Sequence, residues 1–277
     1  MTEKTALVLS AGGMFGAYQA GVWDVLSGAF KPDLVVGASV GSLNGWLIAS
    51  GISPSSLVDR WLNLEQMSRI RWRLPRSLFD GVLDSSALEN TIREMCSADA
   101  LQTDFGVVLT KIPDLRATLF RAPEVEWRHI ASSCAVPFFL THHQIEGSFY
   151  SDGGLVDPLP IWAAIEMGAT RIVCINLLKV RPWYIHGVVR AVQAWGKYTE
   201  SSYAGVRIVE IAPRQSLGST KDSMYWTREN AERWILQGRE DAESAVPAVV
   251  ECLEWGPGRG LPDSGESERC SSTTFTV

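Results

Sequence analysis

The segment from Gly37 to Gly41, Gly-Ala-Ser-Val-Gly, is the feature that most limits how this chain can fold. It follows a short apolar run at 34–36 and precedes a helical pattern over 42–50. A strand that turns directly into a helix lifts the central side chain above the sheet edge, and the flanking glycines prevent crowding in the turn. Ser39 would then lie at a helix N-terminus, where backbone dipoles favour negative charge. The segment predicts a nucleophile elbow, with an ordinary glycine-containing turn as the alternative.

Short β-rich runs alternate with helical patterns along the chain. We expect strands at 5–9, 33–36, 105–110, 116–120, 171–176 and 206–211. We expect helices near 17–28, 42–50, 55–66, 86–96, 158–168, 184–199 and 227–245. This alternation predicts an α/β fold with a mostly parallel central sheet and helices on both faces. The short connection at 111–115 predicts a hairpin, and therefore one antiparallel pair.

The length of 277 residues, with 46% hydrophobic residues, allows one large α/β domain or two small ones. From Gly256 onward the composition shifts to glycine, proline, serine and charged residues. We therefore expect one domain over 1–252 and a flexible C-terminal tail over 253–277.

Charge and cysteine content exclude several classes of function. The net charge is −6 and no long basic block occurs, so nucleic acid is not an expected partner. The five cysteines are scattered without a C-x-x-C pair, which indicates neither a disulfide framework nor a zinc site and favours a reducing compartment. We see no secretory signal and no apolar run of the roughly 18 residues that a membrane span requires. We expect a cytoplasmic protein and leave peripheral membrane contact open.

A glycine-rich turn at 10–16 follows the first expected strand and includes Gly12, Gly13 and Gly16. Glycines at a strand-to-helix turn let backbone N–H groups face an anion, either a phosphate or the oxyanion of an acyl-transfer intermediate. A dinucleotide site requires G-x-G-x-x-G and an acid near the end of the second strand. The glycine spacing here differs, and Asp33 precedes that strand, so we disfavour a nucleotide ligand.

A third segment, 151–160, contains Asp152 followed by two glycines. Two glycines leave the backbone open on one side, so a partner from another strand end can reach the carboxylate. A turn capped by the aspartate is the alternative.

No histidine is placed as an obvious catalytic base. The four histidines of the chain are His129, His142, His143 and His186. A direct dyad, in which Asp152 takes the proton of Ser39, is the simpler arrangement. It requires a partly buried carboxylate, because desolvation raises its pKa towards the working pH.

These three segments, in this order, resemble the patatin-like phospholipase family over about residues 7–246. Residues 131–139 and 158–175 are also similar to segments of that family. The resemblance implies a three-layer α/β/α fold and a Ser39–Asp152 dyad. It further implies that backbone amides near three loop residues form the oxyanion hole, namely Gly12, Gly13 and Met14.

The chain departs from the family pattern at three positions. Ala11 replaces the first of three consecutive glycines, and Phe15 stands where an arginine or lysine is common. Asp157 stands where an asparagine often follows the aspartate motif. Backbone donors survive the first two changes, but a cationic helper is lost at Phe15.

The resemblance implies hydrolysis of a lipid ester bond, by acyl transfer to Ser39 and then to water. The expected partner is a lipid or acyl-ester substrate, whether phospholipid, lysophospholipid or another ester, and neither a metal ion nor an organic cofactor is required. One alternative is an acyltransferase or thioesterase that uses the same dyad. Another is a non-catalytic, regulatory protein that binds an acyl lipid.

Two further segments carry open interpretations. Residues 183–199 predict an amphipathic helix, which either packs on the sheet or acts as a lid. In 69–76, four arginines alternate with apolar residues. That segment is either a solvated strand or loop, or a contact with an anionic membrane.

Overall fold

The computed structural model describes residues 3–64, 86–98, 100–137, 139–179 and 205–254. The expected amphipathic helix at 183–199 and the arginine-rich segment at 69–76 lie outside these residues, and so does nearly all of the expected tail. The last described helix continues to Glu254, two residues beyond the boundary expected at 252.

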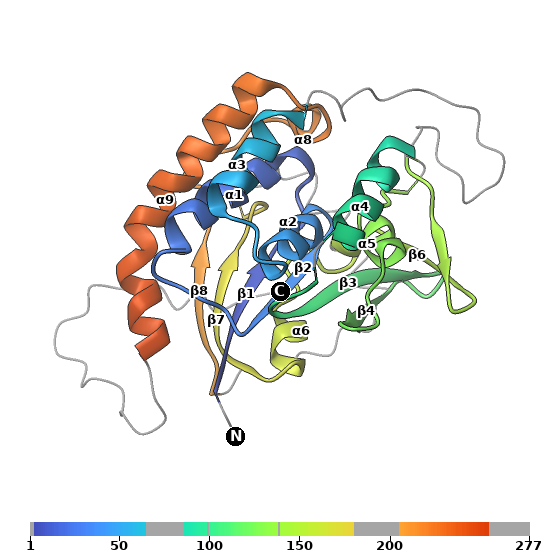
Figure 1. Ribbon diagram of the computed structural model, residues 1–277, viewed down its shortest axis with the longest axis horizontal. Helices are drawn as coiled ribbons and strands as arrows, with labels where there is room; N and C mark the ends of the chain where they lie inside the picture. Colours follow the sequence, from blue (N-terminus) through green and yellow to red (C-terminus); the bar gives the residue numbers. More distant parts are fainter. Residues whose placement is uncertain (1–2, 65–85, 99, 138, 180–204, 255–277) are drawn as a thin grey trace.

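Within the described residues, eight strands form one sheet (Figure 1). The strands are β1 (Lys4–Leu9), β2 (Leu34–Ala38), β3 (Asp104–Ile112), β4 (Arg116–Arg121), β5 (His143–Ile145), β6 (Ser148–Ser151), β7 (Ala169–Ile175) and β8 (Arg207–Ile211). Their order is β5-β6-β3-β2-β1-β7-β8, with β4 also paired to β3. Strands β3, β2, β1, β7 and β8 run parallel, whereas β4, β5 and β6 join by antiparallel pairs. The predicted sheet and the β3–β4 hairpin are confirmed.

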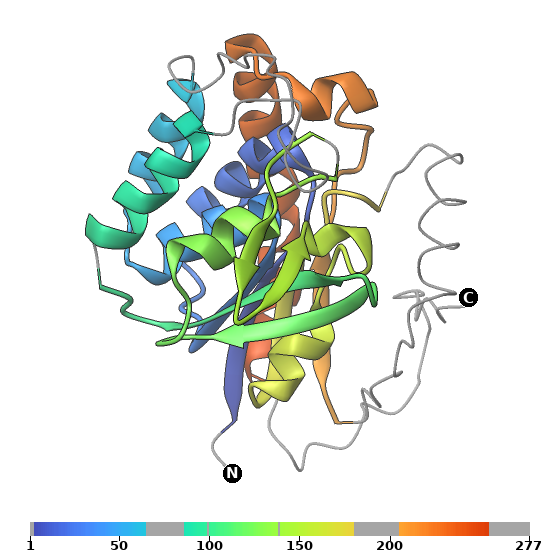
Figure 2. The ribbon, with the colours of Figure 1, turned by 90° about the vertical axis from the view of Figure 1, so that its right-hand side faces the viewer.

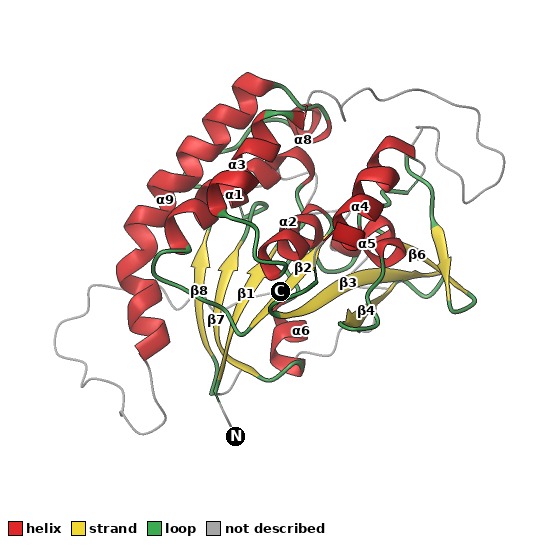
Figure 3. Cartoon of the chain, viewed as in Figure 1, coloured by secondary structure: helices red, strands yellow, loops and turns green. Residues whose placement is uncertain are grey.

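Helices cover the two faces of the sheet unequally, as the colouring of Figure 3 shows. The helices are α1 (Gly16–Leu26), α2 (Val40–Ala49), α3 (Pro54–Leu62), α4 (Ser86–Ala98), α5 (Trp127–Ser133), α6 (Ile161–Glu166), α8 (Thr220–Met224) and α9 (Arg228–Glu254). Figures 1 and 2 place α6 on the opposite side of the sheet from α1 and α2. No helix in the described ranges is both long enough and apolar enough to cross a lipid bilayer.

Alternation along the strands explains the two layers. In β1, Leu7 and Leu9 belong to the larger core with α1, α2 and α9, whereas Ala6 and Val8 belong to a smaller core with α6. Because successive side chains of a strand point to opposite faces, an uninterrupted apolar run indicates a strand buried on both sides.

Strand register brings the expected site residues to one edge of the sheet. Ala38, the last residue of β2, pairs with Val108 of β3. Ser151, the last residue of β6, pairs with Thr110, which also belongs to β3. The residues that follow, Ser39 and Asp152, therefore emerge close together at the carboxyl end of the parallel strands, where open α/β sheets bind ligands.

Candidate active site

Ser39 lies in a strained turn between β2 and α2. Its backbone angles are φ 54° and ψ −129°, in a region that non-glycine residues rarely adopt and that costs about 1–3 kcal/mol. A Cβ added to Gly37 would lie 2.2 Å from the backbone oxygen of Gly41, and one added to Gly41 would lie 2.3 Å from that of Leu9. Both elbow glycines are thus required by close backbone approach.

The Ser39 and Asp152 side chains are hydrogen-bonded to each other. Ser39 Oγ donates to Asp152 Oδ2 at 2.7 Å, and the other carboxylate oxygen, Oδ1, accepts from the backbone N–H of Gly154 at 2.7 Å. The two residues are 7% and 6% exposed. Backbone bonds to Ala135 (3.0 Å) and to the hydroxyl of Thr110 (2.8 Å) fix Asp152 on both sides.

Burial raises the pKa of the Asp152 carboxyl from 3.8 to about 6, although the hydrogen bonds from Ser39 and Gly154 oppose this rise. A carboxylate with such a pKa is ionised at neutral pH and still basic enough to take a proton in a transition state. The Ser39–Asp152 pair therefore has the geometry and the proton affinity that a nucleophile and its general base would need.

Ser133, the last residue of α5, holds the turn at Ser39 through two hydrogen bonds. Its Oγ accepts from the backbone N–H of Ser39 at 2.8 Å and donates to the backbone oxygen of Val108 at 2.9 Å. Ser133 lies within the family-like segment 131–139, but its own position carries no local pattern that predicts this role. The similarity of that segment to the family is the sequence feature that could have indicated Ser133.

The loop after β1 brings two of its three expected donors to the site. Gly13 and Met14 line the cavity that contains Ser39, whereas Gly12 packs against the Leu177 side chain. Val40 also lines this cavity, although it was not among the site residues expected from the sequence. Its position directly after Ser39, at a helix N-terminus, is the sequence feature that could have indicated it.

Phe15 is a packing residue in the structure. Its ring meets the Trp234 ring of α9 edge-on, with centroids 5.1 Å apart and an interplanar angle of 87°. Trp234 is fully buried, and its indole N–H donates to the backbone oxygen of Leu217 at 2.7 Å. The loop after β1 therefore rests on α9 at the position where an arginine or lysine is common in the family that the sequence resembles.

A large apolar cavity of about 790 Å³ opens onto Ser39. One stripe of its wall comes from α2, with Val40, Leu43 and Leu47 at helical spacing. Ile92 and Met95 of α4 form another part, and residues of α3 and the 136–140 and 223–226 segments complete the lining. The space is enclosed mainly by helix side chains that face one another.

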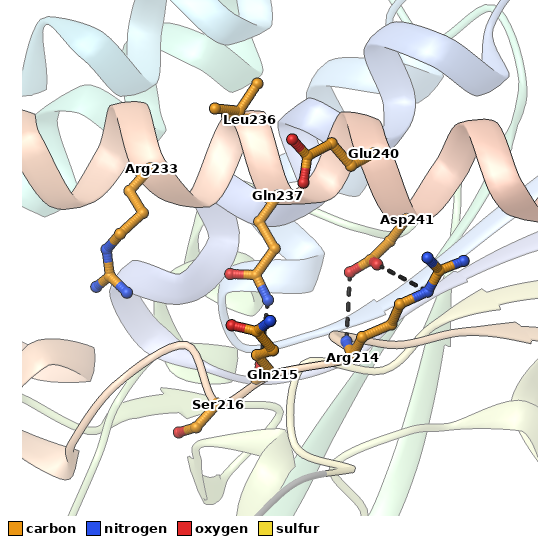
Figure 4. A pocket seen from close by; sticks show the side chains of 8 residues that line it. All are labelled: Arg214, Gln215, Ser216, Arg233, Leu236, Gln237, Glu240 and Asp241. Carbon is orange, nitrogen blue, oxygen red and sulfur yellow. Dashed lines mark hydrogen bonds and ion pairs between the residues drawn. The ribbon is translucent and has the colours of Figure 1, made fainter.

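A second, polar hollow of about 340 Å³ lies between α9 and the residues after β8 (Figure 4). Arg214 forms an ion pair with Asp241 there at 3.4 Å, and Gln237 Nε2 donates to the backbone oxygen of Gln215 at 3.1 Å. It shares no lining residue with the apolar cavity.

The described histidines are engaged elsewhere. His129 Nδ1 accepts from the backbone of Glu126 at 2.9 Å, His142 Nε2 lies 3.1 Å from Ser151 Oγ, and His143 lies 3.6 Å from Glu89. In the part of the chain that the structure describes, no histidine hydrogen-bonds with Ser39 or Asp152, and no cluster of metal-ligating residues occurs. His186 lies outside that part.

The fold and the arrangement at Ser39 define a class of protein. The family described as patatin-like phospholipase matches residues 7–165, and the chain belongs to this family. Family membership supports a lipid hydrolase as the general class of activity, and with the structural likeness described below it confirms the predicted patatin-like α/β/α fold.

Curated relatives are similar over part of their length. An uncharacterised NTE family protein of Mycobacterium tuberculosis is 24% identical over 181 residues, which cover 64% of this chain and 49% of that protein. Human patatin-like phospholipase domain-containing protein 6 is 28% identical over 185 residues, covering 62% of this chain and 13% of that protein. The chain thus spans about half the length of the mycobacterial relative.

Among solved structures, VipD from Legionella pneumophila has a similar fold. The TM-score is 0.56 at 12% sequence identity, and the match covers 89% of this chain and 67% of that chain. At this identity the likeness shows the fold alone.

Proposed function

We propose that this protein is a serine-dependent lipid acyl hydrolase that uses a Ser39–Asp152 dyad. The observation that carries the proposal is the 2.7 Å hydrogen bond from Ser39 Oγ to Asp152 Oδ2, beside an apolar cavity. The family match supports the same class of activity.

The proposed reaction proceeds in two acyl-transfer steps. Ser39 Oγ attacks the ester carbonyl while its proton passes to Asp152 Oδ2, and Asp152 then protonates the leaving alcohol. Water, deprotonated by Asp152, attacks the acyl carbonyl, and Asp152 returns that proton to Ser39 Oγ as the carboxylic acid leaves. Backbone N–H groups of Gly13 and Met14, joined by that of Val40, stabilise the negative oxygen in both steps. This chemistry requires neither a metal ion nor an organic cofactor.

The cavity favours a substrate with an extended acyl chain over a short ester. Its volume of about 790 Å³ is typical of sites that enclose a whole small ligand. With a rise of about 1.5 Å per residue, the stripe on α2 reaches about 12 Å from Ser39 to Leu47. An acyl chain that follows this stripe would exchange water for apolar side chains along its length.

The rim of the cavity supports substrate delivery from a lipid surface. The described residues include six large apolar side chains that are exposed, and four of them line this cavity. The four are Val136, Phe139, Met224 and Tyr225. We propose that this rim touches a lipid aggregate while an acyl chain enters, which would make the protein a peripheral membrane enzyme.

The test is the Ser39→Ala variant, assayed with p-nitrophenyl laurate and with a fluorophosphonate probe. We expect turnover to fall by about 10⁴-fold or more, because the nucleophile is removed, and labelling to disappear. Ser50→Ala is the matched control: Ser50 is also 7% exposed, ends the same helix and donates to the backbone oxygen of Trp46.

Residual turnover of Ser39→Ala within about tenfold of wild type would contradict the proposal. Labelling without hydrolysis, together with ester formation when an alcohol is added, would instead identify an acyltransferase. An unlabelled wild type would favour the non-catalytic alternative.

A further inference from the structure

Two buried amide side chains join the helix that carries Ser39 to the loop after β1. Asn44, on α2, donates from Nδ2 to Gln19 Oε1 at 2.9 Å. Gln19, on α1, donates from Nε2 to the backbone oxygen of Ser10 at 2.8 Å. Asn44 is 2% exposed and Gln19 is wholly buried. The link therefore spans from the nucleophile helix to the first residue of the oxyanion loop.

The hydrogen-bonding groups at the two ends of this link fix which atom of each amide donates and which accepts. The Ser10 backbone oxygen can only accept, so the Gln19 amide must present its nitrogen to it and its oxygen to Asn44. At the other end, the indole N–H of Trp61 can only donate, and Asn44 Oδ1 accepts it at 3.0 Å. Asn44 Nδ2 also donates to the backbone oxygen of Gly16 at 3.0 Å. Reversing either amide would leave buried groups without partners, at about 1–3 kcal/mol each.

A further contact between the two elements is steric. Gly41 of α2 approaches the backbone oxygen of Leu9 so closely that a Cβ would lie 2.3 Å from it. Such a contact limits how near the elements come but does not resist separation or sliding. Directional hydrogen bonds through Asn44 and Gln19 resist both.

We propose that Gln19 and Asn44 are positioning residues, which hold the oxyanion-loop N–H groups at a fixed place relative to Ser39 Oγ. This inference rests on the proposed hydrolytic function. Oxyanion stabilisation depends on donors that are already in place when charge develops, so a shift of the loop affects the transition state more than substrate binding.

The principal test is Gln19→Met, because Gln19 does not line the cavity and methionine is an adaptable apolar replacement of similar length. We expect kcat for p-nitrophenyl laurate to fall by about ten- to a hundredfold, since displacements of about 1 Å have effects of this size. KM should stay within about twofold of wild type, because uniform substrate binding is unaltered.

Asn44→Leu and the Gln19→Met/Asn44→Leu double variant complete a cycle. If the two amides act as one link, breaking it twice should cost little more than breaking it once. Where Gln19→Met does not fold, Gln19→Leu carries the same test, because it also removes the donor to Ser10 and brings no ionisable group into the buried site.

Tyr18→Phe is the matched control. Tyr18 precedes Gln19 on α1, is wholly buried, and donates from its hydroxyl to Asp241 Oδ2 at 2.9 Å on the other side of the helix. Its removal should lower the melting temperature and leave kcat unchanged. The acid limb of the kcat/KM profile, which reports Asp152, should keep its midpoint in all these variants while the plateau falls only in the Gln19 and Asn44 variants.

The inference is overturned by wild-type kcat in the Gln19 variant, or by an equal fall of kcat in Tyr18→Phe. A shifted acid limb would also overturn it, because the defect would then lie in the dyad. Failure of the proposed function is a separate result, seen as wild-type hydrolysis that does not depend on Ser39.

Discussion

The floor of the cavity and its wall differ in what fixes them. The floor consists of the turns that carry Ser39, Asp152 and the oxyanion loop, and it is held by backbone contacts so close that no Cβ fits at Gly37 or Gly41. The wall consists of helix side chains from α2, α3 and α4, which leave about 790 Å³ unfilled. Close backbone contacts fix the geometry of the floor, whereas the unfilled cavity allows the side chains of the wall to change.

The difference assigns different roles to the two regions. A change in the floor should affect every substrate alike, because it alters the reacting atoms or their supports. A change in the wall should discriminate among acyl chains and leave the chemistry intact. Variants in each region test whether the chemistry and the chain-length preference are separate.

The largest effect is expected for Asp152→Asn in the floor. An amide cannot accept the Ser39 proton, so we expect kcat to fall by about 10³–10⁴-fold with short and long esters alike. His143→Ala should be mild by comparison, because His143 lies beside Glu89 and not at the dyad. Loss of activity in His143→Ala as complete as in Asp152→Asn would require a histidine relay.

The same Asp152→Asn variant should be more stable than wild type above pH 6. Burial raises the pKa of Asp152 from 3.8 to about 6, so the folded protein binds that proton more tightly than the unfolded chain. The ionised carboxylate therefore destabilises the fold above pH 6, by about 1–3 kcal/mol, and this penalty disappears as the pH falls towards 4. Urea unfolding of both proteins at pH 4 and pH 8 measures the difference; an equal gap at both values would contradict it.

A smaller and selective effect is expected for Leu47→Trp in the wall. The larger ring would occupy the far end of the α2 stripe, so turnover of the palmitate ester should fall by about tenfold while butyrate turnover stays near wild type. Leu47→Met, which conserves volume, is the control. Equal losses across a chain-length series would mean that Leu47 supports the floor.

The smallest effect is expected at the rim. Replacing Met224 and Tyr225 by serine should reduce hydrolysis of vesicle-borne substrate about severalfold, since each side chain loses part of the roughly 1.5–3 kcal/mol that full apolar burial provides. Turnover of a monomeric octanoate ester should not change. Leu236→Ser is the control, because Leu236 is exposed on α9 beside the polar hollow of Figure 4. Equal losses in the rim and Leu236 variants would exclude a lipid contact at the rim.

Sequence patterns predicted the long strands and the positions of the floor residues. A short apolar run bounded by turn residues indicates a buried strand, and glycines close to a serine or aspartate indicate a tight turn. The positions of β1, β2 and β3 therefore followed from local signals, although β2 and β3 end two residues later than expected, at Ala38 and Ile112. So did the candidate residues Ser39, Asp152 and the loop glycines.

The wall and the supports of the floor could not be predicted in the same way. Strands β5 and β6 and helix α5 are too short for a periodic pattern to establish. Ser133 and Gln19 matter only because folding places them beside distant backbone groups. Phe15 shows the limit most clearly: the sequence indicated a missing cation, and the structure adds an aromatic partner from α9.

The contact between Phe15 and Trp234 has a consequence for the order in which the enzyme is made. Translation proceeds from the N-terminus, so a ribosome that has passed Asp152 has produced both members of the dyad but not the helix on which the oxyanion loop rests. The nascent chain at that stage carries the proposed nucleophile and base without the support for the loop. Competence for the proposed hydrolysis would then arrive only after α9 has been synthesised.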